Sequence, residues 1–209
     1  MEITYTGKVA TLERTIIDLN DFLDGFDIRG GTHRGYFREF NCGNHERFDW
    51  DLGGRLYSQG KQNYQRLSGA DRLKIIINGQ SVCEVDVKAS ALTIFQALGG
   101  HPLDFSDNLD PYALAGLPRE VVKGFITATF GNGQFPTKWS QTVAEERKEY
   151  PIRRVRNIVA GAYPLLAELR RDTAQPPLWA RLMYLESEAV LGDHDRPSGK
   201  GHPEPFGTR

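Results

Sequence analysis

The dipeptide Asn78-Gly79 constrains the fold most, because it lies between two short runs rich in β-branched residues. Asn-Gly is the strongest short-range signal for a two-residue hairpin turn. Residues 73–77 read as the incoming strand and residues 82–87 as the return strand. After Lys88 the apolar residues recur at helical spacing until Gly99-Gly100, which predicts a helix over 89–98. A hairpin that passes directly into a helix predicts an α+β fold.

The remaining elements follow from the same periodicities. An amphipathic pattern predicts a helix over residues 8–24, and "YFREFN" at 36–41 and "GGRLYS" at 53–58 read as two strands that can pair. Further helices are expected over 119–130, 138–149, 151–171 and 177–191. We therefore expect one domain over residues 1–191. The stretch 192–209 holds one aromatic and no aliphatic residue, so it is expected to be a disordered tail.

Charge is balanced overall but unevenly distributed. The net charge is −1 with 25% charged residues, which excludes a strongly basic or a wholly disordered chain. "RKEYPIRRVR" nevertheless concentrates cations between residues 147 and 156. Such a cluster can bind phosphates, or it can be the solvated face of a helix.

Cysteine and histidine usage argues against zinc and disulfides. Cys42 and Cys83 have no metal-ligand spacing and are expected to be buried thiols, and the five histidines form no zinc-binding pattern. No run of apolar residues approaches the length of a membrane span. A cytoplasmic location without a membrane partner is therefore expected.

Asp86 stands at the predicted junction between the return strand and the helix. An acid in this position can cap the helix, lie in a solvated turn or bind a metal ion. Taken alone, the residue favours the cap or the turn.

The order of several segments resembles the palm and fingers of family-A DNA polymerases and single-subunit phage RNA polymerases, and in particular small phage-associated polymerase-like proteins. "GGRLYS" is similar to the TGRLSS segment of that family, and "QNYQRL" at 62–67 is similar to its PNLQNIP segment. "CEVDVKASAL" at 83–92 resembles the first palm motif. "PREVVKGFITATFGNG" at 118–133 resembles the fingers helix. The resemblance implies a small antiparallel palm-like sheet with flanking fingers-like helices.

The resemblance also implies template-directed nucleotidyl transfer with two divalent ions. Two Mg²⁺ or Mn²⁺ ions would activate the primer hydroxyl and stabilise the leaving pyrophosphate, and Asp86 takes the place of the first metal ligand. The implied partners are a DNA or RNA primer–template and a nucleoside triphosphate, and no oligomeric state is predicted.

The resembled fingers helix places Arg119 and Lys123 on the triphosphate, with a solvated helix face as the alternative. Phe130 stands where the family has a tyrosine beside the templating base, although its spacing from Lys123 is one residue short, and a core position is the alternative. Ala91 stands where the DNA polymerases carry a bulky glutamate that excludes ribose. A methyl group there predicts weak discrimination against ribonucleotides.

The same resemblance places Arg55, Gln65 and Arg72 beside the primer-terminal duplex, where arginine contacts in the minor groove check geometry without reading sequence. A cross-strand salt bridge is the alternative for Arg55. The basic region, with Arg153, Arg154 and Arg156, would track template or primer phosphates.

Besides the fingers helix that is one residue short, two further departures weaken the prediction of catalysis. Lys88 occupies a position where the family has a small polar residue, and a cation there could displace a metal ion. The hairpin with the second palm carboxylate is missing, and His194-Asp195 copies its letters without its flanking strands. One carboxylate cannot hold two magnesium ions, so we expect a polymerase-type nucleotidyltransferase that is incomplete, truncated or degenerate and has little activity. The alternative is a non-catalytic nucleic-acid-binding remnant.

Overall fold

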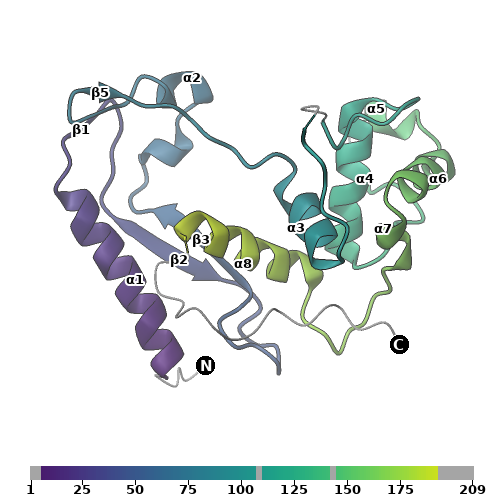
Figure 1. Ribbon diagram of the computed structural model, residues 1–209, viewed down its shortest axis with the longest axis horizontal. Helices are drawn as coiled ribbons and strands as arrows, with labels where there is room; N and C mark the ends of the chain where they lie inside the picture. The colour runs from purple at the N-terminus through teal and green to yellow at the C-terminus, as the bar shows by residue number, and fades with distance from the viewer. Residues whose placement is uncertain (1–5, 107–109, 142–144, 193–209) are drawn as a thin grey trace. The chain divides into compact units, whose positions relative to one another are not determined.

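The computed structural model describes residues 6–106, 110–141 and 145–192, without the side chains of residues 145 and 146. The protein is an α+β protein with two small antiparallel sheets, which confirms the predicted fold class (Figure 1). The chain divides into two compact units, Met1–Asp86 and Val87–Arg209, here called unit 1 and unit 2. Residues 193–209 of the predicted disordered tail lie outside the described residues. No helix in the described ranges is long and apolar enough to cross a bilayer.

Unit 1 carries both sheets. Its elements are α1 (Gly7–Asp24), β1 (Ile28–Arg29), β2 (Tyr36–Phe40), β3 (Gly53–Ser58), the 3₁₀ turn η1 (Tyr64–Arg66), α2 (Gly69–Arg72), β4 (Ile76–Ile77) and β5 (Gln80–Ser81). One sheet has the strand order β1-β4-β5, and the other pairs β2 with β3. In the second sheet Tyr36 lies opposite Ser58 and Glu39 opposite Arg55. The predicted pairing of 36–41 with 53–58 is therefore confirmed.

Side-chain amides occupy the outer edges of the β2–β3 sheet. Asn20 of α1 donates from Nδ2 to Tyr36 O (3.1 Å) and accepts from Tyr36 N–H (2.6 Å). Gln65 of η1 accepts from Ser58 N–H at Oε1 (2.8 Å) and donates from Nε2 to Leu56 O (3.2 Å). These amides satisfy edge groups that an exposed strand would otherwise offer to another chain. A two-stranded sheet is thereby bounded on both sides.

The hairpin turn forms at Asn78-Gly79 as predicted, but the strands differ from the prediction. The incoming strand is Ile76–Ile77 instead of 73–77, and the return strand is Gln80–Ser81 instead of 82–87. Asn78 and Gly79 both have positive φ (48° and 78°), as a two-residue hairpin turn of this kind requires. Ile77 pairs with Gln80 and Ile76 with Ser81, and the ladder ends there. The prediction of a strand over 82–87 is wrong because α2 occupies the residues that an extended incoming strand would need. Val85 is 88% exposed.

Unit 2 is helical and holds most of the core. It contains α3 (Ser90–Leu98), α4 (Arg119–Asn132), α5 (Glu145–Lys148), α6 (Ile152–Ala162), α7 (Pro164–Glu168) and α8 (Leu178–Leu191). Helix α3 packs against α8, and α4 packs against both α6 and α8. Buried side chains from these helices and from the segments that connect them form one hydrophobic cluster: Leu92, Phe95, Tyr112, Val121, Val122, Phe125, Ile126, Phe130, Val155, Val159, Tyr163, Leu166 and Leu182.

Two predicted helices are shorter than expected. Residues 138–141 are not helical, because Trp139 is anchored by tertiary contacts: Nε1 donates to Tyr150 O (2.9 Å), and its ring meets Phe125 edge-on. The predicted helix 151–171 is divided at Pro164, which has no N–H to donate to the preceding turn. The expectation of two buried thiols is also wrong, because Cys83 is exposed.

Candidate nucleic-acid interface

Asp86 lies on an exposed segment without regular secondary structure. Its carboxylate forms no hydrogen bond or ion pair with another described residue. Helix α3 starts instead from Ala89 in a left-handed conformation (φ 50°, ψ 42°), without a side-chain cap. Of the alternatives open for Asp86, the helix cap is thus not what the structure has, while the turn and the metal ligand are compatible with exposure.

The described residues provide no ready-made metal centre. Among them, no group of three or more His, Cys, Asp and Glu side chains lies close enough to hold an ion. Lys88, expected to compete with a metal ion, lies in a turn with its ammonium nitrogen 6.0 Å from the centre of the Phe105 ring. The predicted Mg²⁺ or Mn²⁺ ions would therefore depend on Asp86 together with groups other than a described carboxylate cluster.

Arg119 and Lys123 share helix α4 as predicted, but their environments differ. The Arg119 side chain bonds to two carboxylates, with Nε 2.5 Å from Asp110 Oδ2 and Nη1 2.6 Å from Glu120 Oε1. These bonds raise the pKa of Arg119, with the Asp110 hydrogen bond contributing most. Lys123 is exposed and forms no ion pair with a described residue. Arg119 is therefore neutralised, whereas Lys123 is available to an anion.

Arg147, which belongs to α5, lies against the same end of α4. A Cβ added at Gly124 would lie 2.7 Å from Arg147 Nη1, so the guanidinium rests directly on the α4 backbone. Arg147 Nη2 lies 3.8 Å from Glu120 Oε2. The absence of a side chain at Gly124 is what lets the arginine approach. Arg147 belongs to the basic stretch 147–156 of the sequence, but no sequence pattern predicted its contact with α4.

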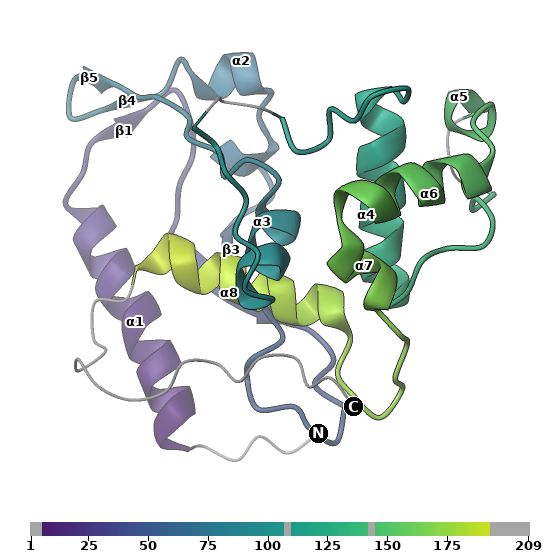
Figure 2. The same cartoon turned by 45° about the vertical axis from the view of Figure 1, so that its right-hand side comes forward.

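Helix α6 exposes the arginines of the predicted phosphate-binding region. Its sequence, "IRRVRNIVAGA", buries Val155 and Val159 and turns Arg153, Arg154 and Arg156 to solvent. Arg154 donates to Gly116 O (3.0 Å), and the Arg156 guanidinium lies 5.9 Å from the centre of the Phe135 ring. Within the described ranges, none of the three pairs with a carboxylate. Helices α4 and α6 pack side by side, as Figure 2 shows.

Phe130 and Ala91 belong to the packing of unit 2. Phe130 is 5% exposed, and its ring meets Phe95 edge-on with centroids 5.4 Å apart. Ala91 is half-buried against the same core. For Phe130 this is the core position that the sequence left open.

In unit 1, the predicted duplex contacts make intramolecular interactions. Arg72 donates to Glu84 Oε1 from Nε (3.0 Å) and Nη2 (2.5 Å), and to Leu67 O from Nη1 (2.9 Å). Gln65 closes the edge of β3, as described above. Arg55 is exposed on β3 directly across from Glu39, where the cross-strand pair considered for it would form.

The pairing of these arginines with acidic residues was not predicted from the sequence. Asp110, Glu120 and Glu84 each accept a hydrogen bond from an arginine predicted to bind nucleic acid or nucleotide. Glu120 is visible in the sequence as the neighbour of Arg119. Asp110 and Glu84 are nine and twelve residues from their partners, beyond any helical spacing. Comparisons with protein-family models, curated proteins and solved structures find no match to this chain.

Proposed function

We propose that this chain binds nucleic acid through its phosphate backbone, with the arginines of α6 as the main contacts. The observation that carries the proposal is that Arg153, Arg154 and Arg156 are exposed and, among the described residues, have no carboxylate partner. Arg72 and Arg119, by contrast, are held by acids. Phosphate groups of a nucleic acid are anions that would supply the negative partner these guanidinium groups lack among the described residues.

The position of these arginines in the helix supports a role in binding. Arg153 and Arg154 lie in the first turn of α6, which contains no acidic residue. The helix dipole makes this end positive, so a cation there costs about 0.3–1 kcal/mol of stability. Arg154 gains a hydrogen bond to Gly116 O (3.0 Å) from its position. The stability of the helix does not explain Arg153 at this unfavourable end, whereas a polyanionic ligand would offset the cost.

Binding of this type is independent of base sequence and sensitive to salt. Each phosphate contact releases condensed counterions, so the logarithm of the affinity falls linearly with the logarithm of salt concentration. The exposed Lys123, on the helix packed against α6, can add to the same positive field.

A salt titration of binding tests the proposal. Fluorescence anisotropy with a labelled duplex would compare the native chain with Arg153→Gln/Arg154→Gln/Arg156→Gln. A matched control, Arg14→Gln/Arg29→Gln/Lys74→Gln, removes three exposed cations that are ion-paired with Asp18, Asp27 and Asp71. The α6 variant is expected to weaken binding and to reduce the salt slope by about 2–3. Equal slopes and affinities for the two variants would refute the proposal.

Polymerase-type nucleotidyl transfer is the second candidate, and the exposure of Asp86 favours it, because an open carboxylate is accessible to a metal ion. Two-metal chemistry needs several protein ligands, and the described residues contain no group of three or more His, Cys, Asp and Glu side chains that could hold an ion. We therefore expect little or no extension of a primer–template by nucleoside triphosphates with Mg²⁺ or Mn²⁺. Primer extension by the native chain and by Asp86→Asn would decide, since activity of the native chain alone would establish the transferase.

A further inference from the structure

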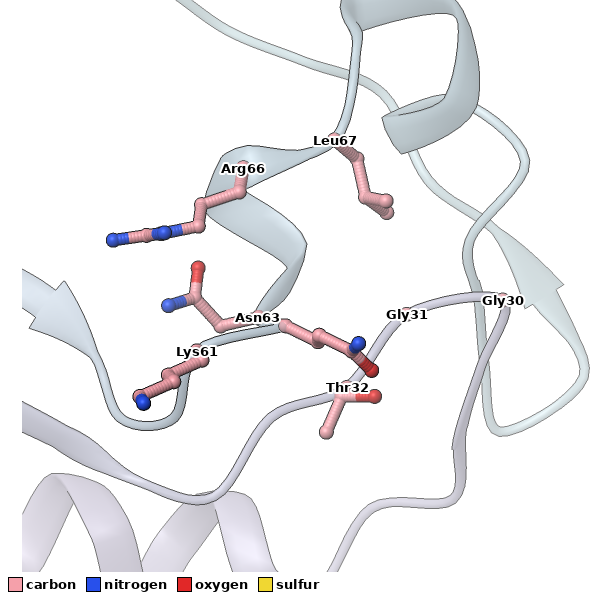
Figure 3. Close-up of a pocket in the computed structure, with 8 residues that line it drawn as sticks. Gly30, Gly31, Thr32, Lys61, Asn63, Arg66 and Leu67 are labelled. Carbon is pink, nitrogen blue, oxygen red and sulfur yellow. The ribbon is translucent and has the colours of Figure 1, made fainter.

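Unit 1 contains an open pocket where two segments of the chain meet. Its volume is about 660 Å³, and it is lined by residues 30–32, 61–63 and 66–67. In Figure 3 the side chains of Lys61, Asn63 and Arg66 project to the same side of the 61–67 segment. Pockets of this volume accommodate small metabolites and mononucleotides.

The charge of the pocket is positive. Lys61 and Arg66 line it, both are exposed, and no carboxylate is among the lining residues. Neither cation forms an ion pair within the described part of the chain. Lysine and arginine without acidic partners in one pocket favour an anion, and both residue types are common ligands of phosphate.

Asn63 adds a polar group that lacks a partner. The residue is 7% exposed, and its Nδ2 donates to Ser58 O (2.9 Å) and Gly60 O (2.7 Å). These two bonds fix the turn between β3 and η1, and hence the backbone that carries Lys61. The Oδ1 atom is buried and accepts no hydrogen bond from a described residue. A buried acceptor without a donor is costly, so a ligand hydroxyl that reaches this atom when the side chains covering it move aside would be favoured.

The opposite wall is backbone. Gly30 has a φ of 81°, and a Cβ on Gly31 would lie 3.0 Å from Ile75 Cδ1 and 3.1 Å from Tyr64 Cβ. Gly31 is thus packed closely on its far side, and Tyr64 N–H donates to Thr32 O (3.0 Å), which ties the two segments together. A wall held in this way keeps the pocket open in the absence of a ligand.

We propose that this pocket binds a sugar phosphate, with the phosphate between Lys61 and Arg66. The side chains that cover Asn63 Oδ1 move aside on binding, and a sugar hydroxyl then donates to this atom. The ligand combines the two features that the pocket lacks, an anion and a hydrogen-bond donor. The site goes beyond the proposed contact at α6, because it lies in the other unit and shares no residue with it. The phosphorylated sugar can be a free metabolite or a unit of an RNA strand.

An NMR titration of the full chain tests the proposal, with ribose 5-phosphate, ethyl phosphate and inorganic phosphate as probes. Ribose 5-phosphate is expected to shift the backbone amides of Gly31 and Thr32 and the side-chain amide of Asn63, and to leave the α6 amides unchanged. It is expected to bind about tenfold more tightly than ethyl phosphate, which has no hydroxyl to offer. Equal affinities for the two esters would overturn the role of Asn63.

Two variants distinguish binding at Lys61 and Arg66 from a general electrostatic attraction of the phosphate to the chain. Lys61→Gln/Arg66→Gln is expected to weaken binding of ribose 5-phosphate by about tenfold or more. Lys8→Gln/Arg14→Gln removes one lysine and one arginine of α1 and is expected to bind as the native chain does. Binding that is unchanged in the pocket variant, or absent for every phosphate probe, would overturn the proposal.

The source of the ligand is resolved by a further titration. If a short single-stranded RNA shifts the same amides and binds more tightly than ribose 5-phosphate, the ligand is a unit of an RNA strand. If the RNA binds more weakly, the ligand is a free sugar phosphate. Failure at this pocket leaves the α6 proposal standing, because the α6 variant is measured separately. Loss of duplex binding in the α6 variant likewise leaves the pocket titration unaffected.

Discussion

Arg119 and Asp110 form a hydrogen-bonded ion pair at the start of α4, with Nε 2.5 Å from Oδ2. Asp110 also accepts from Tyr112 N–H (2.9 Å), and the Arg119 guanidinium lies 5.4 Å from the centre of the Tyr112 ring. These contacts tie α4 to the segment that precedes it. An arginine predicted to meet a triphosphate is therefore part of the internal structure of unit 2.

Acid is expected to destabilise unit 2 through Asp110. The Tyr112 N–H and the Arg119 side chain lower the pKa of Asp110 from its ordinary value of 3.8. A carboxylate with a lowered folded-state pKa contributes stability that is fully present above its unfolded pKa and is lost as pH falls through the folded pKa. Urea unfolding followed by circular dichroism should show a smaller decline between pH 7 and pH 3 in Asp110→Asn than in the native chain. Asp86→Asn, which removes an exposed carboxylate, should show the full decline, and a full decline in Asp110→Asn would contradict this account.

Replacing Arg153 by glutamate is expected to stabilise α6 while it weakens nucleic-acid binding. An acid in the first turn interacts favourably with the helix dipole, so Arg153→Glu should raise the free energy of unfolding by about 0.3–1 kcal/mol. Arg156 lies one turn further along, near the Phe135 ring, so Arg156→Glu should give no such gain. Chemical unfolding and anisotropy on the same samples would test both effects. A loss of stability in Arg153→Glu would contradict the prediction.

Two glycine-to-alanine changes in unit 2 are expected to have opposite effects. A Cβ at Gly99 would lie 2.1 Å from Leu165 Cδ2, so Gly99→Ala must displace a packed leucine and should cost about 1–3 kcal/mol. At Gly124 the obstacle is the end of the Arg147 side chain, which can move, and alanine favours a helix interior by up to about 1 kcal/mol. Gly124→Ala should therefore be neutral or stabilising. Thermal unfolding of both variants would check the contrast, and equal losses would contradict it.

Removing either edge amide is expected to loosen the β2–β3 sheet locally. In Asn20→Ala the Tyr36 N–H loses its acceptor, and in Gln65→Ala the Ser58 N–H loses its acceptor. Each variant should cost about 0.5–1.5 kcal/mol and speed hydrogen exchange at the affected amide. Gln80→Ala, in the other sheet, serves as the control. Unchanged exchange at Tyr36 and Ser58 would mean that the amides do not protect these edges.

The sequence predicted the elements that local signals determine. The Asn78-Gly79 turn and the starts of α4 and α8 after proline depend on residues close to each element, and all were found where expected. The absence of a strand over 82–87 depends on α2. Ser68 caps that helix by accepting from Asp71 N–H (3.2 Å) and donating to its carboxylate (2.7 Å). Ser68 and Asp71 have the spacing of a capping box, so this signal was present in the sequence.

The candidate site was harder to predict, because it depends on contacts between distant segments. Phe130 follows Val122 and Ile126 at four-residue intervals, so its buried face could have been recognised from periodicity. The ion pair between Arg119 and Asp110 could not have been recognised from the sequence, because it requires the chain between the two residues to fold back. The roles of Asp86, Lys123 and the α6 arginines in binding stay predictions.

The helices of unit 2 have a consequence for how this part of the chain folds. Helices α4, α6 and α8 each begin after a proline, Pro118, Pro151 and Pro177, and none has a side-chain cap. Peptides cut from them would be largely unstructured in water, because short helices without caps gain little from their own hydrogen bonds. Their persistence depends on the shared cluster around Phe125, so these helices should melt together in one cooperative transition.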